Sequence, residues 1–89
     1  MILNEATRSV TWNGATYGLT PVQTAILSAL RGTPTQTTTE LAVRVYGEEY
    51  GKTRQAANNL HQQLHYLRQR VPGLVESQQT AVHRLGKVA

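Results

Sequence analysis

The chain has 89 residues, no cysteine and a formal net charge of +4. This length suits one domain, residues 1–89, with a small hydrophobic core, and the lack of cysteine excludes disulfide bonds and thiolate chemistry. No apolar run approaches the roughly eighteen residues of a membrane span, and the first residues lack the basic and apolar blocks of a signal peptide, so we expect a cytoplasmic protein.

The charge is divided unevenly along the chain. Residues 1–49 carry three arginines against four glutamates, a sum of −1, whereas residues 50–89 carry six basic residues against Glu76 alone, a sum of +5. All three histidines also lie in the second part. This asymmetry indicates that one end of the domain faces a polyanion.

Residues 1–19 are predicted to form strands. Two β-prone runs, Val10–Trp12 and Thr16–Leu19, are joined through Asn13-Gly14, a dipeptide that favours a tight hairpin because both positions tolerate positive φ. Ile2-Leu3 could add a third, edge strand. Trp12 and Tyr17 are expected to cover the helices from this sheet.

A first helix is predicted over residues 20–31. Thr20 can cap it, Pro21 suits the first helical position, and Gln23 completes a capping box. Gly32 is expected to end it. The predicted buried stripe consists of Val22, Ile26, Leu27 and Leu30.

A polar, threonine-rich connection follows, which Pro34 keeps non-helical and in which Gln36-Thr37 could form a single bridge of sheet. Thr37 and Glu40 form a second capping box that opens a short helix over residues 38–46. Residues 47–51, GEEYG, are predicted to be a turn. A helix, a short turn bounded by glycines and a longer polar helix are the arrangement of a helix-turn-helix.

The longest predicted element is a helix over residues 52–71. Its apolar residues recur at spacings of three and four. The twenty residues include no acidic side chain, whereas an ordinary solvated face would favour glutamate and lysine in pairs. Asparagine and glutamine can bond bidentately to adenine, and arginine binds guanine or phosphate. We therefore interpret it as a DNA recognition helix, with a merely polar solvent face as the alternative; its proposed base contacts are Gln55, Asn58, Asn59, Gln62, His65 and Tyr66.

After Pro72-Gly73, a closing hairpin is predicted over residues 74–88, with strands at 74–77 and 81–88. This hairpin would be a wing that places Arg84, His83 or Lys87 beside the DNA backbone or in the minor groove. The predicted fold class is thus α+β, a winged helix-turn-helix with an N-terminal β-hairpin, three helices and a C-terminal wing.

Three stretches resemble the winged-helix output domain of OmpR-type response regulators. They are GLTPVQTAILSAL at residues 18–30, TTTELAVRVYG at 37–47 and LHYLRQRV at 64–71. The resemblance spans residues 10–88 and implies that positions 58, 59, 62, 65, 66 and 68 face DNA. This chain departs from the family in having fewer arginines there, and in ending its wing with Arg84-Leu85-Gly86-Lys87 where the family has a Gly-x-Gly-Tyr run. No receiver domain precedes residue 1, so we expect a stand-alone small regulator, for example from a bacterium, phage or mobile element, or a domain excised from a larger protein.

The sequence gives little support for a metal site or for enzymatic activity. His61 and His65 have a helical metal spacing, but a site would need a third ligand from His83 or a glutamate, so we predict no metal and no cofactor. No phosphate loop, nucleophile elbow or carboxylate cluster indicates an enzyme.

We therefore expect a small transcriptional regulator that binds double-stranded DNA in a sequence-specific manner, through tandem or dimeric sites. The backbone contacts would come from Arg54, Arg68, Arg70, Arg84 and Lys87. Two alternatives remain: a protein-interaction module on a winged-helix scaffold, binding RNA polymerase or another regulator, and a self-assembling protein that organises DNA with little sequence preference. The acidic turn at Glu48-Glu49 favours the first of these alternatives.

Overall fold

The chain begins with a meander of three short strands. In the computed structural model, which describes residues 1–33, 35–79 and 82–85, β1 (Ile2–Asn4), β2 (Ser9–Trp12) and β3 (Ala15–Gly18) form an antiparallel sheet in that order. Asn13 and Gly14 have φ of 50° and 83°, so a tight turn joins β2 to β3. The predicted hairpin and its third strand are confirmed.

Two helices begin with the predicted capping boxes. At α1 (Pro21–Gly32), the Gln23 amide nitrogen donates to Thr20 Oγ at 3.2 Å while Gln23 Oε1 accepts from the Thr20 nitrogen at 3.1 Å. Thr37 and Glu40 repeat this arrangement at α2 (Thr38–Tyr46), with distances of 3.2 and 3.0 Å. Each box satisfies backbone donors that a helix start leaves open. The first helix was predicted over residues 20–31, with Gly32 ending it from just outside. In the structure Gly32 is instead the last residue of α1, because the Thr33 nitrogen still donates to the Ala29 carbonyl.

The prediction of a plain turn at residues 47–51 is wrong, because a short helix, α3 (Glu48–Gly51), lies there. Gly47 has φ of +99° and turns the chain away from α2. Glu48 and Glu49 then occupy the first turn, where negative charge suits the positive end of a helix. Gly51 packs on the backbone of α2 so closely that a Cβ would lie 2.5 Å from Val43 Cα. The described residues therefore contain four helices rather than three.

The long helix, α4 (Arg54–Arg70), supplies one wall of the core. It starts two residues later than predicted because Thr53 is its N-cap, with Thr53 Oγ accepting from the Ala56 nitrogen at 3.1 Å. Its apolar stripe is fully buried and belongs to one hydrophobic core with side chains of α1, α2 and both sheets. The buried stripe comprises Ala56, Leu60, Leu64 and Leu67, and the other members of this core include Val10, Ile26, Leu30, Leu41 and Val75.

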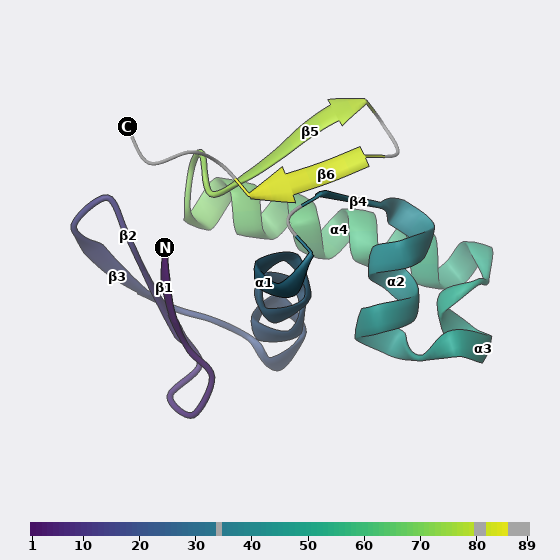
Figure 1. The fold of residues 1–89 in the computed structure, drawn as a ribbon, viewed down its shortest axis with the longest axis horizontal. Coiled ribbons are helices and arrows are strands. Elements are labelled where there is room, and N and C mark those ends of the chain that lie inside the picture. Colours follow the sequence, from purple (N-terminus) through teal and green to yellow (C-terminus); the bar gives the residue numbers. More distant parts are fainter. Residues whose placement is uncertain (34, 80–81, 86–89) are drawn as a thin grey trace.

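A second antiparallel sheet closes the fold in the order β4-β6-β5. The hairpin strands are β5 (Val75–Gln79) and β6 (Val82–Leu85), so β5 runs further than predicted. β4 (Thr35–Thr37) makes three register pairs with β6 instead of a single bridge. Figure 1 shows α4 passing behind this sheet, with α2 and α3 near the start of α4 and the β1–β3 sheet beyond α1.

Gln36 links β4 to the end of α1. Its side chain is 1% exposed, and Nε2 donates to the carbonyl oxygens of Ala29 and Thr33 at 2.8 and 2.9 Å. The Ala29 carbonyl already accepts from the Thr33 nitrogen at 3.0 Å, whereas the Thr33 carbonyl belongs to the C-cap, beyond the last helical N–H. The side chain thereby caps α1 from the neighbouring strand and fixes the start of α2 relative to α1.

Candidate nucleic-acid interface

The outward face of α4 carries a continuous stripe of polar side chains. All six predicted base-contact residues lie on it, because each is three or four residues from another member of the set, which follows the helical repeat. The stripe covers eleven residue steps, which is about 16 Å of helix. Asn59 is half-buried and the others are exposed, namely Gln55, Asn58, Gln62, His65 and Tyr66.

Two tyrosine hydroxyls hold amides of this stripe. Gln62 Nε2 donates to the Tyr66 hydroxyl, one turn further along α4, at 3.0 Å. Asn59 Nδ2 donates to the hydroxyl of Tyr50 at 2.9 Å. Tyr50 lies in α3, so a residue from outside the long helix forms part of its outward face. The sequence did not point to Tyr50, although its place three residues after a glycine and beside two glutamates is compatible with a short helix.

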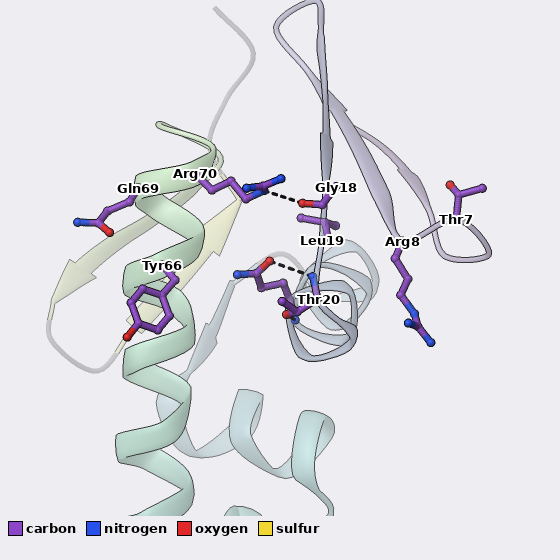
Figure 2. Close-up of a pocket in the computed structure, with 9 residues that line it drawn as sticks. Thr7, Arg8, Gly18, Leu19, Thr20, Tyr66, Gln69 and Arg70 are labelled. Atoms are coloured by element: carbon purple, nitrogen blue, oxygen red, sulfur yellow. Dashed lines mark hydrogen bonds between the residues drawn. The ribbon is translucent and has the colours of Figure 1, made fainter.

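Basic residues flank the stripe at both ends of α4. Arg54, its first residue, and Arg70, its last, are both exposed, and they are separated by about 24 Å along the helix. Arg70 is also anchored, because its Nε donates to the Gly18 carbonyl at 2.6 Å (Figure 2). Of the predicted wing contacts, Arg84 lies in β6 opposite Thr35 and Glu76, and Lys87 lies outside the described residues.

Arg68 and His83 have an interior location. His83, one of the wing residues expected beside DNA, is 2% exposed, so that expectation is wrong. Arg68 is half-buried, and its Nη2 lies 3.3 Å from His83 Nδ1. Burial, then the charge of Arg68 and then His61 lower the pKa of His83 from 6.5 to about 4. The pair thus joins α4 to β6 instead of extending the outward stripe.

A shallow groove separates the end of α4 from the first sheet. It has a volume of about 810 Å³ and is lined by Thr7, Arg8, Gly18, Leu19, Thr20, Gln23, Tyr66, Gln69 and Arg70. None of these nine residues is acidic. In Figure 2, Arg70 turns toward Gly18 whereas Tyr66 and Gln69 turn away from it, and Arg8 lies on the other side of the strand. Tyr66 lines the groove and is also a member of the outward stripe of α4, so the two surfaces adjoin at this residue.

The histidines of α4 differ in their surroundings. Both are exposed, but His61 Nε2 lies 3.2 Å from Thr38 Oγ, whereas the ring of His65 tilts against that of Tyr66 with 5.9 Å between ring centroids. Within residues 1–33, 35–79 and 82–85, no group of three or more histidine, cysteine or carboxylate side chains could hold a metal ion. His61 thus serves the contact between α4 and α2.

No family model, curated protein or solved structure matches this chain. Among the described residues, no helix is both long enough and apolar enough to cross a membrane.

Proposed function

We propose that this protein binds double-stranded DNA in a sequence-specific manner as a small transcriptional regulator, and that its fold is a winged helix-turn-helix. In this proposal α2, α3 and α4 form the helix-turn-helix, α4 enters the major groove, and the β5–β6 hairpin is the wing beside the backbone. One observation carries the proposal: α4 turns a continuous stripe of amide, imidazole and phenol groups to solvent.

The side chains of this stripe can match the hydrogen-bonding edges of bases. Amide side chains such as Gln62 and Asn58 offer a donor and an acceptor together, which matches adenine in the major groove. The groove is about 12 Å wide and admits one helix. In this proposal Arg54 and Arg70, at opposite ends of α4, would contact phosphates on the two sides of such a groove, Arg70 through its Nη groups because its Nε is bonded to the Gly18 carbonyl.

Charge supports the same proposal. The helix and its cap, residues 52–71, contain no acidic residue, while residues 50–89 have a net charge of +5. A basic surface draws in a polyanion, and phosphate contacts supply much of the affinity. Two acidic residues, Glu48 and Glu49, precede this helix in the sequence. They lie in α3, and Glu48 forms an ion pair with Lys52 at 3.6 Å.

The test is selection of binding sites from a random duplex pool, followed by mobility-shift titrations at several salt concentrations. We expect an enriched motif, and affinity that falls steeply with salt. Gln62→Ala should change the preferred base at one position, whereas Lys87→Ala should lower affinity for all duplexes alike. Gln63→Ala is the matched control, because Gln63 is rotated by about 100° around the helix from Gln62. No enriched motif together with a flat salt response would contradict the proposal.

A second candidate is a protein-interaction module that binds RNA polymerase or another regulator. The exposed acidic side chains of Glu48 and Glu49 on α3 favour it, because they would repel phosphate and attract a basic protein surface. Pull-down with purified polymerase subunits, with Glu49→Gln as the variant, tests this candidate in parallel with DNA binding on the same preparation. Capture that Glu49→Gln abolishes, with no DNA binding, would select the second candidate.

A further inference from the structure

Two tyrosine hydroxyls bond amide groups on the outward stripe of α4, one from α3 and one from α4 itself. Tyr50 accepts from Asn59 at 2.9 Å and Tyr66 accepts from Gln62 at 3.0 Å. Tyr50 is 38% exposed and Tyr66 is 46% exposed, so neither ring is used to fill the core. At such a surface water could also satisfy both amides.

The donor count of each amide shows what the bonds leave available. A side-chain amide has two N–H donors and one carbonyl acceptor. Each tyrosine takes one N–H, so Gln62 and Asn59 each keep one N–H and the carbonyl oxygen. One donor beside one acceptor is the pattern that pairs with N7 and N6 of adenine. The adenine-binding pattern of each amide stays intact when the N–H given to the tyrosine is the one on the side away from the carbonyl oxygen.

The bond also restricts the amide. A free amide can rotate by 180° and exchange its nitrogen and oxygen, which would present the opposite pattern to a given base. A hydroxyl can donate or accept, but once the Tyr66 hydroxyl donates its own hydrogen to DNA it can only accept, so Gln62 must turn an N–H toward it and that exchange is excluded. The bond also selects one rotamer of Gln62 before DNA arrives, so less affinity is lost on binding.

Each tyrosine hydroxyl can also donate a hydrogen bond. A tyrosine hydroxyl that accepts from an amide still has its own hydrogen to donate. At Tyr66 and Tyr50 that hydrogen is available to a phosphate oxygen or to a base acceptor such as thymine O4. The two pairs thus extend the stripe with an additional donor each.

We propose that Tyr66 and Tyr50 are positioning residues that set Gln62 and Asn59 to recognise adenine, so that the preferred DNA carries two A·T base pairs side by side. Asn59 and Gln62 are three residues apart, which is about 4.5 Å along the helix axis, and base pairs are stacked about 3.4 Å apart. The two amides therefore reach neighbouring base pairs. This inference rests on the proposed DNA binding and specifies its target.

The experiment measures base preference at each of these positions. Starting from the duplex selected by the wild-type protein, each adenine is replaced in turn by the other three bases, and the dissociation constants are compared for wild type, Tyr66→Phe, Gln62→Ala and the double variant. We expect wild type to prefer adenine by about tenfold or more at the Gln62 position. Tyr66→Phe should lose most of that preference, and should add no further loss in the Gln62→Ala background.

Matched variants separate positioning from general effects. Tyr17→Phe removes a hydroxyl from the first sheet and should leave every preference unchanged. Tyr50→Phe should reduce the preference at the Asn59 position only. Gln62→Glu should move the preference from adenine toward cytosine, because a carboxylate accepts from cytosine N4.

The outcomes distinguish this inference from the function on which it rests. If wild type selects no DNA sequence, the proposed function fails, and this inference fails with it. If wild type selects a motif without adenine at these positions, the function stands and the inference is overturned. A Tyr66→Phe variant that keeps the full preference, or that weakens binding to all duplexes equally, would also overturn it.

Discussion

Nη2 of Arg68 lies 3.3 Å from Nδ1 of His83, and because a guanidinium group has only donors, this histidine nitrogen must accept. The remaining proton of the neutral ring is then on Nε2, which lies 2.9 Å from Thr38 Oγ and donates to it. The Thr38 hydroxyl in turn donates to His61 Nε2 at 3.2 Å. The three hydrogen bonds thus form one chain in which each residue donates to the next, from Arg68 in α4 to His83 in β6, then to Thr38 in α2 and finally to His61 in α4.

Acid is expected to destabilise the fold through His83. Its pKa is about 4 in the folded protein, against 6.5 for an ordinary histidine. Between these values the unfolded chain binds more protons, so stability rises with pH. The stability is fully present above pH 6.5 and is lost as the pH falls toward 4. The loss in the free energy of unfolding amounts to about 3 kcal/mol, which urea titrations at a series of pH values would measure.

The control for this prediction is His83→Gln, whose amide can still donate to Thr38 but does not titrate. At neutral pH we expect the variant to be less stable than wild type. As the pH falls from 6.5 to 4, the difference between the two proteins should shrink. Parallel pH profiles for the two would show that His83 is not the group responsible.

Gly51→Ala should be strongly destabilising. A Cβ at this position would lie 2.5 Å from Val43 Cα and 2.7 Å from the Ala42 carbonyl oxygen, so α3 would have to move away from α2. We expect a cost of about 2 kcal/mol or more, in the range of overpacked cores. Gly32→Ala, with open space around the added Cβ, should instead stabilise α1 by about 0.5–1 kcal/mol. Equal effects of the two substitutions on the thermal midpoint would contradict this explanation.

Thr37→Ala should weaken the start of α2. The substitution removes the acceptor of the Glu40 N–H, leaving one donor of the first turn without its cap. The expected loss is about 1 kcal/mol in the free energy of unfolding, measured by urea denaturation. Thr39→Ala, at an exposed position inside the same helix, is the control and should have little effect. A Thr37→Ala protein as stable as the Thr39→Ala protein would exclude a role for the capping box.

If α4 enters the major groove as proposed, Arg54→Gln should reduce the salt dependence of DNA binding. Each phosphate contact contributes about 0.9 to the slope of log affinity against log salt concentration. Loss of one contact should therefore lower the slope by about one and weaken all duplexes alike. Arg44→Gln makes the same charge change on the exposed surface of α2 and should leave the slope unchanged. Identical slopes for the two variants would place Arg54 outside the interface.

The sequence alone determined the elements whose signals are local. The Asn13-Gly14 turn and the caps at Thr20 and Thr37 depend on atoms no more than about four residues apart, so they were predictable from residue types and spacing. The outward position of Gln62 followed in the same way from the apolar spacing of α4. These signals were sufficient for α1, α2 and α4 and for the polar stripe.

Only the tertiary structure decided the contacts between distant segments. The burial of His83 against Arg68, the bond of Tyr50 to Asn59 and the capping of α1 by Gln36 each require two elements to be packed together. The alternation of a strand does not tell which of its faces meets a helix, and a short segment such as α3 forms because Gly51 can approach α2 closely. Packing, which depends on the whole chain, therefore determined which basic and aromatic side chains join the outward surface and which serve the interior.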